Sequence, residues 1–144
     1  MFFTDSAVAR LRENNFWSID GTFKVVPNPY EQLLSISYIR EHHIHPAVYT
    51  ILKDKSEQTY TKMLTILTEL VGIYSNIIKT DFELASINAF RNFFPEARLS
   101  GCLFHLGQSV QRKVSNYGLK SLLRNLVLYV DPLDHYHIIF YTRR

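Results

Sequence analysis

The hydrophobic periodicity of the sequence changes near Ser56, and this change constrains the possible folds more than any other feature. Upstream, apolar and polar residues alternate with a period of two, which predicts a strand over residues 30–40. Downstream, apolar residues recur at spacings of three and four. This spacing predicts an amphipathic helix over residues 56–74 with Ser56 as its N-cap. The chain is therefore expected to combine a sheet with helices that pack on it.

The remaining segments extend this alternation to both sides. Apolar, aromatic or β-branched runs bounded by Gly and Pro predict strands, and further runs with helical spacing end at Pro95 and near Gly118. The order of elements is then β-β-β-α-β-α-β-α, an α/β fold with a mixed sheet. Five strands are predicted, the first over residues 16–20 and, after Gly21, 23–26, and the others over residues 30–40, 46–52, 76–80 and 98–104. Helices are predicted over residues 56–74, 83–94 and 106–117.

Length and composition exclude several classes of protein. The 144 residues suffice for one domain with a buried core, and one cysteine cannot form an internal disulfide. Because the sequence has neither a membrane-spanning apolar run nor a signal-peptide pattern, we expect an intracellular protein without a membrane partner. Residues 101–144 carry six Lys/Arg and two Asp/Glu. Such an excess points either to a polyanionic partner or to a solvated helix face.

Two aspartates follow predicted strands. Asp20 ends the first strand and Asp81 ends the fourth, and ligands of α/β sheets bind at the carboxyl ends of strands. Two carboxylates suit Mg²⁺ or Mn²⁺, which also bind water and phosphate oxygens. The alternative is structural, because an Asp after a strand is often a turn former or a helix cap.

The residues around these aspartates form motifs. Ile19 to Pro27 reads Ile-Asp-Gly-Thr-Phe-Lys-Val-Val-Pro, and Thr80 to Glu83 reads Thr-Asp-Phe-Glu. Phe94-Pro95 precedes Gly-Cys-Leu-Phe-His-Leu at residues 101–106. In this order the motifs resemble the first-aspartate, second-aspartate and Cys-x-x-His motifs of the transposases of Mutator-like elements, the MULE transposase domain. The resemblance covers residues 16–118.

The resemblance implies a ribonuclease-H-like fold and a DDE-type active site. Asp20 and Asp81 would be the first two acids, both catalytic and metal-binding, with Mg²⁺ or Mn²⁺ as cofactor. The implied activity is metal-dependent cleavage and strand transfer of DNA phosphodiesters. The implied partner is DNA at transposon ends, with a homo-oligomer as a further possibility and the nucleus as the location.

The sequence departs from the family pattern after residue 118. A DDE site needs a third carboxylate, but this segment has no glutamate, and its acids, Asp131 and Asp134, flank Pro132. Because a missing ligand weakens metal binding, we predict that the chain is inactive or nearly so. We divide it into an N-terminal extension (1–15), a catalytic core (16–118) and a truncated or divergent tail (119–144).

Other candidate residues have weaker support. Cys102 and His105 match the family motif, and with His42, His43 or His45 they could bind zinc, but a packed cysteine and a loop-ordering histidine explain them as well. The three histidines near residue 43 are predicted to lie in an exposed hairpin loop. Lys79, Arg112 and Lys113 are candidates for contact with a nucleic-acid backbone.

Three functions therefore remain open from the sequence, and the third of them is a stand-alone ribonuclease-H-like nuclease with the same fold and metal site. One is the catalytic core of a Mutator-like transposase, in a truncated or degenerate copy. The alternative is a non-catalytic, transposase-derived domain that binds DNA or protein. The enzyme requires Asp20, Asp81 and a third acid, whereas the binding domain tolerates loss of both aspartates.

Overall fold

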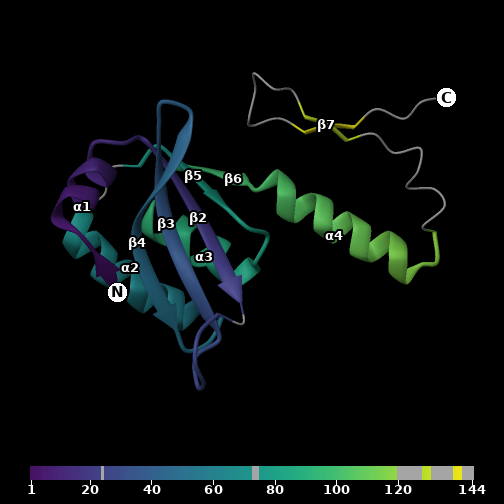
Figure 1. The fold of residues 1–144 in the computed structure, drawn as a ribbon, viewed down its shortest axis with the longest axis horizontal. Coiled ribbons are helices and arrows are strands. Elements are labelled where there is room, and N and C mark those ends of the chain that lie inside the picture. The colour runs from purple at the N-terminus through teal and green to yellow at the C-terminus, as the bar shows by residue number, and fades with distance from the viewer. Residues whose placement is uncertain (24, 73–74, 120–127, 131–137, 141–144) are drawn as a thin grey trace. The chain divides into compact units, whose positions relative to one another are not determined.

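The computed structural model describes residues 1–23, 25–72, 75–119, 128–130 and 138–140 (Figure 1). The chain divides into two compact units, residues 1–101 and residues 102–144. The core predicted over 16–118 and the tail predicted over 119–144 stay predictions, and most of that tail lies outside the described residues.

The first unit holds a sheet and three helices. Its elements in chain order are β1 (Phe2–Phe3), α1 (Asp5–Arg12), β2 (Phe16–Phe23), β3 (Gln32–Arg40), β4 (His43–Leu52), α2 (Glu57–Val71), β5 (Ile77–Thr80), α3 (Leu84–Phe93) and β6 (Arg98–Gly101). The second unit contains α4 (Leu103–Asn116) and an antiparallel pair of short strands, β7 (Leu128–Val130) and β8 (Ile138–Phe140).

The six strands of the first unit form one mixed sheet in the order β1-β4-β3-β2-β5-β6. The strands β2, β3 and β4 form an antiparallel meander, and β5 and β6 continue the sheet parallel to β2. A meander followed by parallel strands with helical crossovers is the ribonuclease-H-like arrangement. From β2 to α4, the order of elements is β-β-β-α-β-α-β-α, so the predicted fold class is confirmed.

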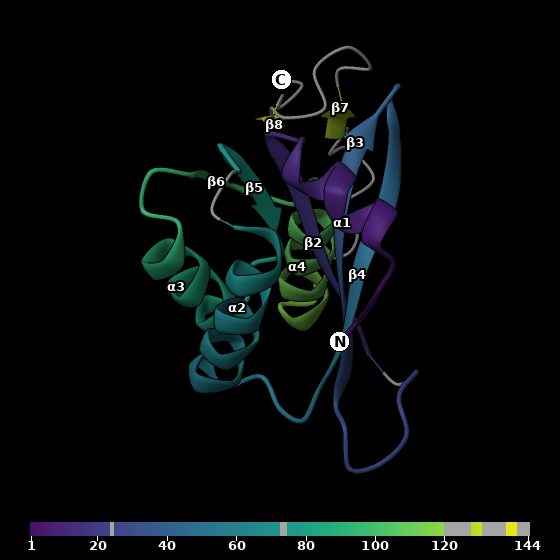
Figure 2. The same cartoon turned by 90° about the vertical axis from the view of Figure 1, so that its left-hand side faces the viewer.

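The hydrophobic core lies between the sheet and one helical layer. Figure 2 shows α2 and α3 together on one side of the sheet, and α1 packs against α2, β3 and β4. Helix α2 begins at Ser56, whose hydroxyl accepts from the Thr59 amide at 3.2 Å, as predicted. Its apolar stripe is buried as expected, with Tyr60, Met63, Leu64, Leu67 and Val71 all inaccessible to solvent or nearly so.

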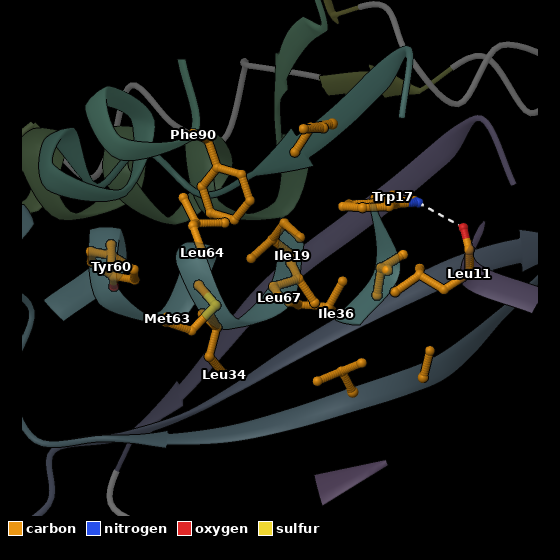
Figure 3. Close-up of a cluster of buried hydrophobic side chains, with 14 of the residues drawn as sticks. Leu11, Trp17, Ile19, Leu34, Ile36, Tyr60, Met63, Leu64, Leu67 and Phe90 are labelled. Atoms are coloured by element: carbon orange, nitrogen blue, oxygen red, sulfur yellow. Dashed lines mark hydrogen bonds between the residues drawn. The ribbon is translucent and has the colours of Figure 1, made fainter. Parts of the chain in front are cut away.

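Trp17 anchors the N-terminal helix to this core (Figure 3). Its indole is fully buried, and Nε1 donates to the carbonyl oxygen of Leu11 at 3.0 Å. The ring also meets Phe94 edge-on, with centroids 5.5 Å apart. Helix α1 is therefore part of the core, although the sequence analysis predicted no element before residue 16.

On the opposite face of the sheet, polar residues gather along β2, β5 and β6, and this area is called the polar face. Along β2 and β5 the core-facing residues alternate with residues that are partly or fully exposed. Strand pairing places these residues side by side, with Ser18 opposite both Ser37 and Lys79, and Lys79 opposite Ser100. Helices α1, α2 and α3 all pack on the other face. The polar face carries Asp20, the first residue of the candidate site.

Four sequence predictions need correction. Strand β2 continues three residues beyond Asp20, because Gly21 to Phe23 pair with β3, so Asp20 is not its last residue. His43 and His45 lie in β4, and the hairpin turns at Glu41 and His42, both with positive φ. The last predicted strand ends at Gly101, where the second unit begins.

The fourth correction concerns α3. The spacing of Leu84, Ile87, Phe90 and Phe94 in the sequence predicts one core-facing stripe, but Leu84 is 70% exposed. Among the described helices, none combines the length and apolar character needed to span a bilayer.

Candidate active site

Asp20 lies on β2, and Asp81 directly follows β5, the parallel neighbour of β2. The last registered pair of β2 and β5 is Ser18 with Lys79, and each aspartate follows its member of that pair by two residues. Because side chains alternate along a strand, Asp20 is on the same face as Ser18 and Lys79. Asp20 is exposed and Asp81 half-buried. The two aspartates therefore come at corresponding points of the chain, one near the end of β2 and one just after β5.

The carboxylate of Asp81 also organises the start of α3. Its Oδ1 accepts from the backbone amide of Glu83 at 3.2 Å, a turn in which Asp bonds the amide two residues on. Glu83, not Asp81, is the N-cap residue. Asp81 is therefore a turn former rather than the helix cap, which was the structural alternative to a metal ligand. The Glu83 amide holds one of its carboxylate oxygens.

Glu83 points away from the solvent and toward α2. Its Oε1 accepts from the Tyr60 hydroxyl at 3.0 Å, and its Oε2 lies 3.7 Å from Lys55 Nζ. Partial burial raises the pKa of the Glu83 carboxyl above its usual range, against the opposing effects of Tyr60 and Lys55.

Tyr60 is itself hydrogen-bonded from the sheet. Gln32 Nε2 donates to the Tyr60 hydroxyl oxygen at 2.6 Å. Burial raises the pKa of Tyr60, so its hydroxyl keeps its proton. Gln32 lies against the first motif, because a Cβ built on Gly21 would stand 2.9 Å from Gln32 Oε1. Hydrogen bonds and packing thus connect Gly21, next to Asp20, with Glu83, whose amide donates to Asp81.

Lys55 makes a second connection between the two aspartate motifs. Its Nζ lies 3.5 Å from the centroid of the Phe23 ring, a cation–π contact. The same Nζ forms the ion pair with Glu83. Phe23 and Glu83 belong to the first and second motifs, so one side chain bridges both.

The first residue of the third motif, Gly101, packs against the second motif. A Cβ added to Gly101 would clash with Cζ of Phe82. The Phe82 ring therefore lies over a position where only glycine fits without displacement. Close packing accounts for the Phe after Asp81 and for the Gly before Cys102.

Cys102 and His105 lie at the start of α4. Cys102 is the N-cap residue, with a free thiol, and His105 lies in the first turn with its ring 5.6 Å from that of Phe104. Across the part of the chain that the structure describes, no three His, Cys, Asp or Glu side chains gather closely enough to hold an ion. The described residues therefore offer neither a zinc site nor a third acid beside Asp20 and Asp81, and Asp131 and Asp134 lie outside them.

The candidate nucleic-acid contacts fall in different units. Lys79 lies on the polar face of the sheet, half-buried between Ser18 and Ser100. Arg112 and Lys113 are exposed on α4. Considered within its own unit, each of these side chains is accessible to a polyanion.

Sequence analysis missed the roles of Gln32, Tyr60, Glu83 and Lys55. Gln32 occupies a core-facing position in a strand otherwise filled by Leu34 and Ile36, and a polar residue there signals a buried hydrogen bond. The Tyr60 hydroxyl in an apolar stripe carries the same signal. No sequence pattern predicts the contacts of Lys55 with Glu83 and Phe23.

The strand order defines the class of this protein, a ribonuclease-H-like domain. The model of the MULE transposase domain matches residues 16–109, about two thirds of the chain, and the chain belongs to this family. The three motifs described above all lie within the match.

Comparison with solved structures finds retroviral proteins among the matches. One is the simian T-cell lymphotropic virus intasome in complex with PP2A regulatory subunit B56 gamma, with 19% identity, a TM-score of 0.47, and coverage of 77% of this chain and 40% of that one. Another is the HTLV-2 integrase catalytic core domain in complex with magnesium, with 20% identity, a TM-score of 0.46, and coverage of 77% and 73%. This chain therefore spans less than half of the first structure's chain. No curated protein matches the sequence.

Proposed function

We propose that Asp20 and Asp81 bind a divalent metal ion, and that this domain is the catalytic core of a Mutator-like transposase in a truncated or degenerate copy. The supporting observation is that each aspartate comes two residues after the Ser18–Lys79 pair of adjacent parallel strands, Asp20 on β2 and Asp81 directly after β5. Family membership adds to this, since both lie in the matched segment.

The donor set fits magnesium or manganese. Both side chains offer carboxylate oxygens, which Mg²⁺ prefers, and one or two carboxylates leave positions for water and phosphate oxygens. Asp20 is exposed and so remains accessible from solvent, while the Glu83 amide orients one oxygen of Asp81. A bound ion of this kind activates water or a 3′-hydroxyl for attack on a DNA phosphodiester. The proposed partner is DNA at transposon ends, bound by a homo-oligomer in the nucleus.

A second function has one observation in its favour. Within the described residues, no third acid stands beside the aspartate pair, and phosphoryl transfer depends on the charge that such ligands help to place. A non-catalytic domain that binds DNA or protein would need no third acid.

Calorimetric titration with Mn²⁺ tests the proposal directly. We expect saturable binding by the wild type and loss of binding in the Asp20→Ala/Asp81→Ala variant, with folding of both checked by circular dichroism. An Asp5→Ala/Glu96→Ala variant, changed at two acids outside the site, is the control. A folded wild type that binds no Mn²⁺ would contradict the proposal. Binding without nicking of supercoiled DNA would favour the non-catalytic alternative.

A further inference from the structure

We propose that Gln32, Tyr60 and Glu83 form a positioning relay that fixes Asp81 in register with Asp20. The relay runs from β3 through α2 to the start of α3. It rests on the proposed function, since the position of Asp81 relative to Asp20 matters most if the two share a metal ion. None of the three is proposed as a ligand or catalytic residue.

The hydrogen bonds of the relay can run in only one direction. An ionised carboxylate only accepts, so the Tyr60 hydroxyl donates its one proton to Glu83. The oxygen of Tyr60 must then accept from the sheet, and Gln32 presents its amide nitrogen to it at 2.6 Å. Each group thus has a defined orientation, which a chain of rotatable hydroxyls would lack.

Burial gives the relay rigidity. Gln32 is 0% and Tyr60 1% exposed, so water does not substitute for either partner when the bond between them breaks. Hydrogen bonds in such a low-dielectric setting are stronger, and an unpaired group there is costly. The Glu83 side chain is held from its other oxygen by Lys55, which itself lies on Phe23.

One end of the relay contacts Asp81, and the other end contacts the residue that follows Asp20. At one end, the Glu83 amide donates to Asp81 Oδ1. At the other, Gln32 pairs with Phe23 in the β2–β3 ladder, and its Oε1 packs against Gly21, the residue after Asp20. A shift of the β5–α3 junction would therefore strain bonds that are tied to β2.

A purely structural role would give a different result from a positioning role. If the bonds only stabilise α2 against α3, removing one lowers the free energy of unfolding and leaves metal affinity alone. A group that orients a metal ligand instead changes affinity, typically by about 10–100-fold. The deciding measurement is therefore the Mn²⁺ affinity of each variant, compared between proteins that are folded to the same extent.

The Tyr60→Phe variant removes the central hydroxyl and keeps the buried ring. We expect Mn²⁺ to bind it about 10–100-fold more weakly than the wild type, with circular dichroism unchanged. Tyr49→Phe, which removes the hydroxyl of an exposed tyrosine on β4, is the matched control and should bind as the wild type does.

Two substitutions at Glu83 separate the hydrogen bond from the charge. Glu83→Gln keeps an oxygen that can accept from Tyr60, so it should retain most of the affinity, whereas Glu83→Ala should lose as much as Tyr60→Phe. Because Glu83 is only half-buried, its variants serve if Tyr60→Phe does not fold.

A second measurement does not depend on metal. Amide hydrogen exchange reports the Glu83 N–H, which is bonded to Asp81, and we expect faster exchange in Tyr60→Phe than in Tyr49→Phe. Wild-type Mn²⁺ affinity in Tyr60→Phe would overturn the relay and leave the proposed function standing. If the wild type binds no Mn²⁺, the proposed function fails, and unchanged exchange at Glu83 would then overturn the relay separately.

Discussion

Gly21 leaves no room for a side chain beside Gln32: a Cβ at residue 21 would stand 2.9 Å from Gln32 Oε1. Gln32 cannot easily move, because it is fully buried and its amide donates to Tyr60. We therefore predict that Gly21→Ala lowers the free energy of unfolding by about 1–3 kcal/mol, the usual cost of overpacking a core, measured by urea unfolding.

The matched control is Gly101→Ala, where an added Cβ meets Phe82 instead. The clash is nominally closer, but Phe82 is 46% exposed and its ring can turn into solvent. Gly101→Ala should therefore lower the free energy of unfolding by less than Gly21→Ala does. An equal or larger loss there would show that the packing of Phe82, not that of Gln32, is the tighter constraint.

The sequence predicted the sheet and the first two crossover helices because their periodicity is strong. The stripe of α2 and the alternation of β3 each follow from local spacing. Helix α1 was missed because its eight residues bury only Val8 and Leu11, too few to produce a periodic signal. Its place in the core depends on Trp17, which lies outside the helix.

For the candidate site, the sequence supplied the two aspartates but not their neighbours. Asp20 and Asp81 stand in motifs, whereas Gln32, Tyr60 and Lys55 reach the site from three separate segments. Their contacts depend on strand register and helix placement, which local patterns do not encode. The continuation of β2 beyond Asp20 was hidden by Gly21, since a glycine within a strand also predicts an interruption.

The bond from Trp17 to Leu11 gives a prediction for α1. Trp17→Phe removes the indole donor and part of the buried ring. We expect a loss of about 1–3 kcal/mol in stability, together with faster amide exchange across α1. Phe94→Leu is the control, since it loosens the ring contact with Trp17 but keeps the bond to Leu11. Equal exchange of α1 in both variants would contradict this role of the bond.

Asp54 makes stability depend on pH at the start of α2. Hydrogen bonds from the side chains of Ser56 and Thr59, and from the Ser56 amide, lower the pKa of Asp54 to about 2. In the unfolded chain the pKa of Asp is about 3.9, so the unfolded state binds more protons between these values. The contribution of Asp54 is therefore fully present above about pH 4 and is lost as the pH falls through 2.

Asp54→Asn removes this dependence. At neutral pH the variant should be less stable, because a neutral oxygen is a weaker acceptor and interacts less with the helix N-terminus. The difference from the wild type should shrink as the pH is lowered from 4 to 2, in urea unfolding at a series of pH values. Parallel curves for the two proteins over that range would show that the ionised carboxylate does not stabilise α2.

Lys79 offers a test of nucleic-acid binding at the polar face of the sheet. It follows the core residue Ile78 and precedes Thr80, which is also buried, so its side chain lies on the face that carries Asp20. If it contacts a DNA phosphate, Lys79→Gln weakens binding and lowers the slope of log K against log salt by about 0.9 for duplex DNA. Lys62→Gln, an exposed lysine on α2, is the control on the helical side. Because both variants lose the same charge, a general electrostatic effect would change both slopes equally, and only a selective change at Lys79 places DNA on the aspartate face.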